Sequence, residues 1–230
     1  MATVLVIGGN RGIGLEFVKQ YLARGDTVIA TCRDVSSADN LNQLQADNDN
    51  LSVLTLDVAS DESLLAFPQQ LGDTAVDIFI NNAGVYGPRD SVFGNVDENN
   101  WLPVLRVNSI APMLLTQGII DNLRKGQDKK LLYVTSKMGS IDDNKGGGSY
   151  VYRSSKAALN AVVKSIAVDL SAEGFTAAVL HPGWVQTDMG GPNALIDTQT
   201  SVSGMMSVID NLDGSHVGSF FNYDGNIIPW

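Results

Sequence analysis

Residues 3–14 read Thr-Val-Leu-Val-Ile-Gly-Gly-Asn-Arg-Gly-Ile-Gly, an apolar run that passes directly into a turn rich in glycine. The run is β-branched and apolar, which predicts a buried strand. A helical pattern begins at Leu15, so the glycines lie at a strand-to-helix connection. Glycines there permit a tight turn and let backbone N–H groups approach a pyrophosphate at the helix N-terminus. The stretch therefore predicts an α/β fold with a dinucleotide site at its first connection.

Further short apolar and β-branched runs alternate with helical patterns, near residues 27–31, 51–56, 76–80, 131–135, 175–180 and 217–221. Several are almost continuously apolar, as expected when helices cover both faces of a parallel sheet. The order predicts a doubly wound parallel sheet of about seven strands. Residues 1–230 contain no internal repeat, and we expect them to form a single dinucleotide-binding and catalytic domain.

Composition excludes several classes of partner. The 230 residues carry 15 basic and 25 acidic side chains, and the net charge of −10 repels nucleic acid and anionic membranes. Cys32 is the only cysteine, so we expect no disulfide within the chain. No cluster of His, Cys and Asp residues has the spacing of metal ligands, so we expect no metal. No apolar run approaches the ~20 residues of a membrane span. A strand that begins almost at Met1 leaves no room for a signal peptide, which favours a cytoplasmic protein.

A hydroxyl, a phenol and an ammonium group lie further along the chain at a spacing suited to proton-coupled hydride transfer. Ser136 follows the predicted strand 131–135, and Tyr152-x3-Lys156 opens a long helical pattern sixteen residues later. Residues four apart on a helix share one face, roughly 6 Å apart along the axis. The phenol and the ammonium can therefore meet at one site.

A second pair has the same spacing but a different environment. Tyr133-x3-Lys137 runs along the predicted strand and out of its end, where four residues span roughly 13 Å. These two side chains cannot share a proton. We therefore predict that Tyr152, and not Tyr133, is the chemically active tyrosine.

Together these motifs resemble the short-chain dehydrogenase/reductase family, over essentially the whole chain. The glycine loop has the spacing Gly-x3-Gly-x-Gly, counted from Gly8. The other matching motifs are Asp57-Val58, Asn81-Asn82-Ala83-Gly84, Asn108, Ser136, Tyr152-x3-Lys156 and Pro182-Gly183. Within the family, Asn10-Arg11, the 146–148 glycines and the 224–230 ending resemble the sniffer and C-factor carbonyl reductase group. The resemblance implies a single-domain Rossmann-type fold.

The resemblance implies four catalytic residues. Tyr152 would protonate the carbonyl oxygen as hydride arrives from the nicotinamide, and Ser136 would orient that oxygen. A free phenol has a pKa near 10, so the Lys156 charge would favour the phenolate, and Lys156 would also hold the nicotinamide ribose. Asn108 would hold a water that links the lysine to solvent. The interval between Ser136 and Tyr152 is longer than is common in the family, which leaves Ser140 as the alternative serine.

NADP(H) is the predicted cofactor, with NAD(H) as the alternative. Arg33 follows the second strand and Arg11 lies in the glycine loop, so both could bind a ribose 2′-phosphate. Asp34 could instead serve NAD. The full set of predicted cofactor residues is Gly8, Asn10, Arg11, Gly12, Ile13, Gly14, Arg33, Asp57, Val58, Asn82, Ala83, Gly84, Tyr152, Lys156, Pro182, Gly183, Val185 and Thr187.

The predicted function is an oxidoreductase that transfers a hydride from NADPH to an aldehyde, ketone or quinone. The alternative is an NAD(P)-binding signalling or regulatory protein of C-factor type, in which turnover is incidental. The sequence does not identify the substrate, although a lid is implied over 188–200. Candidate pocket walls are Val85, Tyr86, Met138, Trp184 and Met189.

Two features of the chain leave alternatives open. Gly146-Gly147-Gly148 could be a linker by composition, but a domain boundary there would separate Ser136 from Tyr152, so we interpret it as a mobile loop beside the site. The amphipathic stretches 97–123 and 152–172 favour a homodimer, because family members pair such stretches across a two-fold axis. The same apolar stripes could equally be core.

Overall fold

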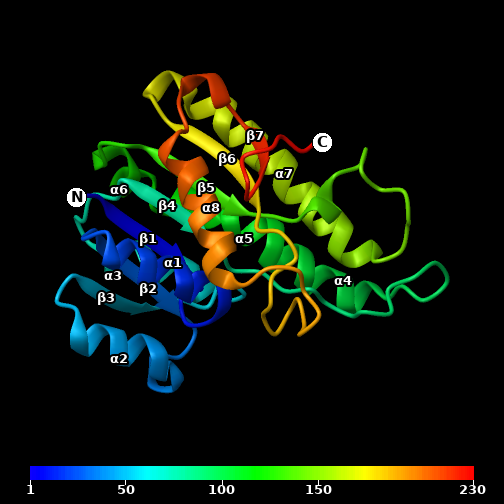
Figure 1. Cartoon of the computed structure of the whole chain (residues 1–230), viewed down its shortest axis with the longest axis horizontal. Coiled ribbons are helices and arrows are strands. Elements are labelled where there is room, and N and C mark those ends of the chain that lie inside the picture. Colours follow the sequence, from blue (N-terminus) through cyan, green and yellow to red (C-terminus); the bar gives the residue numbers. More distant parts are fainter.

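A single sheet of seven parallel strands forms the centre of the protein in the computed structural model, which describes residues 1–230 (Figure 1). The strand order is β3-β2-β1-β4-β5-β6-β7, so the chain reverses direction across the sheet between β3 and β4. The predicted doubly wound parallel sheet is therefore confirmed. The strands are β1 (Thr3–Ile7), β2 (Thr27–Cys32), β3 (Leu51–Thr55), β4 (Ile78–Asn81), β5 (Lys130–Val134), β6 (Thr176–His181) and β7 (Ser219–Asn222).

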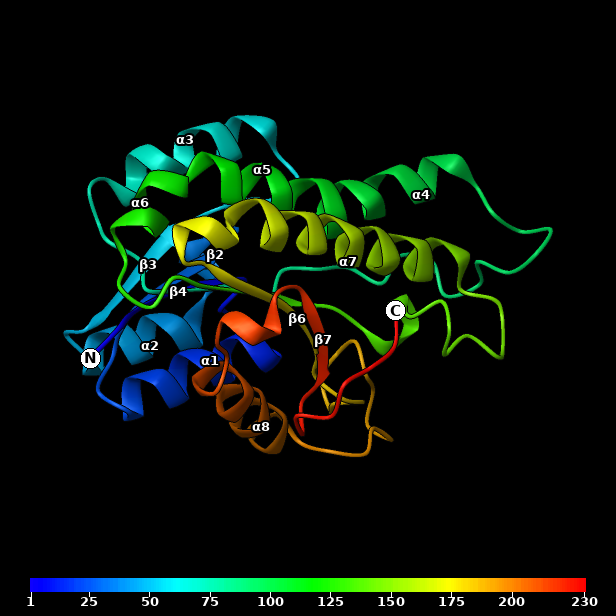
Figure 2. The ribbon, with the colours of Figure 1, turned by 90° about the horizontal axis from the view of Figure 1, so that it is seen from above.

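Helices cover both faces of this sheet (Figure 2). One layer contains α1 (Gly12–Ala23), α2 (Asp39–Asp47) and α8 (Thr198–Asp210), and the other contains α3 (Asp61–Leu71), α4 (Glu98–Leu105), α5 (Ala111–Gly118), α6 (Ile120–Lys125) and α7 (Tyr150–Leu170). Alternate β1 residues enter separate cores, with Val4 and Val6 in one and Leu5 and Ile7 in the other, as the period of two in a strand requires. No helix has both the length and the apolar character needed to cross a membrane.

Some element boundaries differ from the sequence pattern. Helix α1 begins at Gly12, three residues before the apolar periodicity, because Arg11 is already extended and its carbonyl accepts the N–H of Leu15. The stretch 97–123 forms α4, a π turn at Arg106–Ile110 and then α5 and α6. Pro112 has no N–H to donate to the carbonyl four residues earlier, which accounts for a break in the regular ladder at this point.

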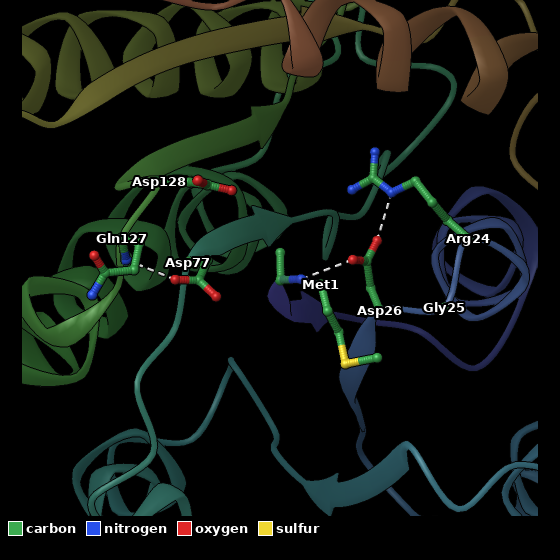
Figure 3. Close-up of a pocket in the computed structure, with 8 residues that line it drawn as sticks. Met1, Arg24, Gly25, Asp26, Asp77, Gln127 and Asp128 are labelled. Carbon is green, nitrogen blue, oxygen red and sulfur yellow. Dashed lines mark hydrogen bonds and ion pairs between the residues drawn. The ribbon is translucent and has the colours of Figure 1, made fainter.

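A hollow of about 490 Å³ lies at the amino edge of the sheet (Figure 3). Two of its three carboxylates are already bonded to the protein: Asp26 accepts the N–H of Ala2 at 2.8 Å and pairs with Arg24, while Asp77 accepts the N–H of Thr3 at 2.7 Å. These groups satisfy N–H donors where strands begin. The hollow is therefore a structural feature at the end of the sheet opposite the predicted catalytic residues.

The predicted homodimer can be tested through the apolar side chains that these helices expose, which include Leu102, Ile110, Met113, Leu114 and Val168. If a second copy packs on α5, light scattering at micromolar protein should give about twice 24.5 kDa, and Leu114→Glu should return the mass to one chain. Leu65→Glu, on the exposed side of α3, is the matched control and should leave the mass unchanged. A single-chain mass for the parent protein would contradict the prediction.

Candidate active site

The site lies where the carboxyl end of β5 meets the first turns of α7. The Lys156 ammonium donates to the Val134 carbonyl at 3.0 Å, and the Thr135 hydroxyl donates to the Asn160 side chain at 2.7 Å. Between them, the 3₁₀ helix Lys137–Gly139 lies so close to α7 that a Cβ on Gly139 would come within 2.8 Å of the Lys156 carbonyl carbon. These contacts set the register of α7 against the strand and bring Tyr152 beside Ser136.

Burial shifts the pKa values of the Tyr152 and Lys156 side chains in opposite directions. Tyr152 is 6% exposed, and burial raises its pKa to about 12, an effect that the neighbouring Ser136 hydroxyl partly opposes. Burial also lowers the pKa of Lys156 to about 8. The Lys156 ammonium lies 5.9 Å from the centre of the Tyr152 ring, so desolvation outweighs the lowering that we expected from its charge. At neutral pH the phenol is therefore protonated.

Asn108 is completely buried inside the π turn and holds the loop after β4. Its amide accepts the Val85 N–H at 2.8 Å, and donates to the Val85 carbonyl at 2.8 Å and to the Ser155 hydroxyl at 2.9 Å. A Cβ on Gly84 would lie 3.3 Å from both the Asn108 oxygen and the Lys156 nitrogen. The structure thus brings Asn108 and Lys156 to the same side of Gly84. The Asn108 side chain itself is fully engaged with protein.

The alternative tyrosine and serine, Tyr133 and Ser140, make contacts that support the fold. Tyr133 is fully buried between the sheet and α5, where its hydroxyl bonds Thr116 at 2.7 Å. Lys137 is exposed and pairs with Asp143 at 3.1 Å. The side chains of Tyr133 and Lys137 therefore point to different parts of the protein. Ser140 accepts the Asp143 N–H at 3.0 Å, while Ser136 caps the 3₁₀ helix by accepting the Met138 N–H at 3.1 Å. The geometry therefore favours Tyr152 and Ser136.

The glycine loop has the shape that a pyrophosphate requires. Gly8 and Gly12 have φ of 75° and 53°, which a residue with a side chain rarely adopts. A Cβ on Gly14 would collide with the Gly8 carbonyl oxygen and lie 2.6 Å from the Asn82 amide nitrogen. No side chain caps the start of α1, so its first N–H groups and the positive end of its dipole remain available to an anion.

The basic residues near this loop differ in their contacts. Arg11 forms an ion pair of 2.6 Å with Asp188, beyond β6, and both side chains are exposed. Arg33 is exposed and makes no ion pair. The Asp34 carboxylate accepts the N–H of Ser36 at 2.9 Å and its hydroxyl at 2.6 Å, which lowers the pKa of Asp34. Arg33 is thus the unpaired group beside β2, and Asp34 is engaged locally.

The remaining predicted cofactor residues follow other strands at the same edge. The Asn82 amide donates to the Gly8 carbonyl at 2.9 Å, and Ala83 lies against Gly8, so the loops after β1 and β4 contact each other. Thr187 lies against Gly12 from the segment after β6. Asp57 and Val58 follow β3, with Asp57 accepting the Ala59 N–H at 3.0 Å. The last three residues, which follow β6, are Pro182, Gly183 and Val185.

Tyr86 is a site residue that the sequence identified only as a pocket wall. Its ring stacks on that of Tyr152, with centroids 4.4 Å apart and planes inclined by 21°. Its hydroxyl lies 3.2 Å from that of Ser149, and the Arg89 guanidinium lies over its ring. No helical or strand periodicity connects the residues of this loop with those of α7, so the sequence alone could not predict the stack. Three other candidate walls, Val85, Trp184 and Met189, are exposed.

Comparison with known proteins gives consistent matches. The model of the short chain dehydrogenase family matches residues 2–195. C-signal of Myxococcus xanthus is 46% identical over 165 residues, which cover 72% of this chain and 99% of that protein. Carbonyl reductase Sniffer of D. melanogaster superimposes with a TM-score of 0.93 at 32% identity, covering 100% of both chains. NADPH-bound carbonyl reductase from chicken fatty liver gives 0.93 at 33%, covering 100% of this chain and 99% of the other.

The packing around Gly14 and Gly146 predicts different effects of an alanine substitution at these two positions. Gly14→Ala should lower the free energy of unfolding by about 1–3 kcal/mol and weaken dinucleotide binding, because the added methyl group must displace the loop. Gly146→Ala is the control, since its Cβ would enter open space. Thermal unfolding and NADPH fluorescence titration measure both effects. Equal behaviour of the two variants would contradict the packing described here.

Proposed function

Because the chain belongs to the short-chain dehydrogenase family, we propose that it is a carbonyl reductase that uses NADPH, with Tyr152 as the proton donor. The observation that carries this proposal is the phenol of Tyr152, protonated by burial and set beside Ser136 at the carboxyl end of β5. A group that remains protonated at neutral pH is suited to act as a general acid. The proposed substrates are aldehydes, ketones or quinones.

In the proposed reaction, Ser136 orients the carbonyl oxygen toward Tyr152. When bound, NADPH supplies the hydride that forms the new C–H bond. The Tyr152 O–H bond breaks as its proton passes to the carbonyl oxygen, which leaves a phenolate beside the Lys156 ammonium. An ammonium near a phenolate stabilises it, so Lys156 would matter most after the proton has left. Asn108 holds the loop of Val85 and Gly84 against Lys156.

Three observations support NADPH over NADH. Arg33 is exposed and unpaired beside β2, where a ribose 2′-phosphate would need a cation. One carboxylate oxygen of Asp34 already accepts two hydrogen bonds from Ser36, which leaves only the other oxygen for a ribose hydroxyl. The chicken enzyme, at 33% identity, is described with NADPH bound.

A signalling function is the second candidate, and the 46% identity to C-signal favours considering it. In that case dinucleotide binding would be the message and turnover incidental. The two candidates differ in what they require of Tyr152, since binding alone needs the glycine loop and not a proton donor. A protein that binds NADPH tightly but reduces no member of a panel of aldehydes, ketones and quinones would favour signalling.

The proton donor can be tested with two conservative substitutions. Tyr152→Phe retains the ring but removes the acid, so kcat should fall by about 10²- to 10⁴-fold while NADPH still binds. Tyr133→Phe makes the same atomic change at a buried site whose hydroxyl bonds Thr116, and kcat should stay within a few fold, with stability reduced by about 1 kcal/mol. Full activity of Tyr152→Phe would refute the mechanism, and equal losses in both variants would refute the site assignment.

Cofactor choice can be tested at the unpaired arginine. Arg33→Ala should weaken NADPH binding about ten- to a hundredfold relative to NADH, since a charge-assisted contact is worth about 1.5–3 kcal/mol. Arg124→Ala removes the same charge on α6, where the arginine pairs with Glu173, and should leave the ratio unchanged. Fluorescence titrations with both dinucleotides measure the ratio. An unchanged ratio in Arg33→Ala would exclude a role for Arg33 in binding the 2′-phosphate.

A further inference from the structure

The stack of Tyr86 on Tyr152 joins two parts of the chain that are otherwise separate. Tyr86 lies in the loop after β4, while Tyr152 lies in the first turn of α7. Their rings are nearly parallel and 4.4 Å apart. Stacked aromatic pairs have a preferred geometry and contribute beyond the area that they bury. A contact of this kind can restrict the orientation of the Tyr152 ring.

Three groups hold the Tyr86 ring in place. Its hydroxyl lies 3.2 Å from that of Ser149 and 4.0 Å from the sulfur of Met138. The Arg89 guanidinium carbon lies 5.2 Å from the ring centroid, within the range of a cation–π contact. Arg89 is itself positioned by donating to the Met189 carbonyl at 3.0 Å. Tyr86 is therefore fixed from its edge and over its ring.

Ser149 gives a second indication that this arrangement has a specific role. It is the residue before α7 and adopts φ of 48°, in the left-handed region that is unfavourable for serine. Serine at such a position usually caps the helix, but here its side chain makes no cap bond and instead meets the Tyr86 hydroxyl. The start of α7 thus directs a hydroxyl to Tyr86 and not to its own backbone.

The contacts that dock α7 against β5 do not by themselves fix the orientation of the Tyr152 side chain. Lys156 and Asn160 fix the helix backbone against β5, but neither contact restrains the two side-chain torsions of Tyr152. We propose that Tyr86 is the positioning residue of the candidate proton donor, holding the Tyr152 ring by stacking so that its hydroxyl stays directed at the substrate oxygen beside Ser136. The inference rests on the proposed reductase function.

Steady-state kinetics of Tyr86 variants, with NADPH and 4-nitrobenzaldehyde as the probe, test this role. Tyr86→Leu removes the stack, and kcat should fall at least fivefold, or about 1 kcal/mol, with KM and the NADPH Kd changed less than twofold. The ratio of kcat in H₂O to kcat in D₂O should increase, because a misdirected phenol makes proton transfer slower. Tyr86→Phe keeps the ring and should retain kcat within about threefold. Tyr150→Leu, at a partly exposed tyrosine of the same helix turn, is the control.

The outcomes separate this inference from the proposed function. If Tyr152→Phe is inactive while Tyr86→Leu matches the parent in kcat and isotope effect, the Tyr86 role is refuted and the reductase proposal stands. If Tyr152→Phe is fully active, the proton donor itself is wrong. Equal losses in Tyr86→Phe and Tyr86→Leu would assign the effect to the hydroxyl and refute stacking. Should Tyr86→Leu fail to fold, Arg89→Gln decides: a drop in kcat at constant NADPH affinity supports the role, and no change refutes it.

Discussion

The position of the candidate proton donor depends on how α7 docks against the end of β5. Two polar contacts set that register, the Lys156 ammonium on the Val134 carbonyl and the Thr135 hydroxyl on Asn160. Both are buried, and buried polar groups are costly to leave without partners. A slip of one residue along the helix would break both contacts at once. The same register that stabilises the helix on the sheet therefore determines where the phenol lies.

Enclosure of the site has a chemical consequence as well as a structural one. The burial that raises the pKa of Tyr152 also lowers that of Lys156. The pKa values of the two groups, which are nearly equal in water, are thus moved apart, and the phenol binds its proton more tightly than the amine does. A pair arranged in this way holds its proton on the phenol in the resting protein, yet has an ammonium within reach of the phenolate that would follow. Desolvation, and not the lysine charge alone, sets the starting state.

The fold was predictable because its determinants are local. Each strand is a short apolar run, and the first connection carries its glycines in sequence, so strand number and parallel order follow from pattern. The proximity of Tyr152 and Lys156 could also be predicted, since helical spacing alone brings them together. The π turn at Arg106–Ile110 was not predicted, because the residues on both sides of it have a continuous helical pattern. The Tyr86 stack joins residues 66 positions apart, which no periodicity reports.

The ion pair between Arg11 and Asp188 connects the glycine loop to the segment after β6. Both partners are exposed to solvent, and the stabilisation from an exposed ion pair becomes smaller as the salt concentration rises. The core of the sheet has no comparable sensitivity. Ionic strength should therefore weaken the link between the glycine loop and the segment after β6 before it alters the stability of the fold.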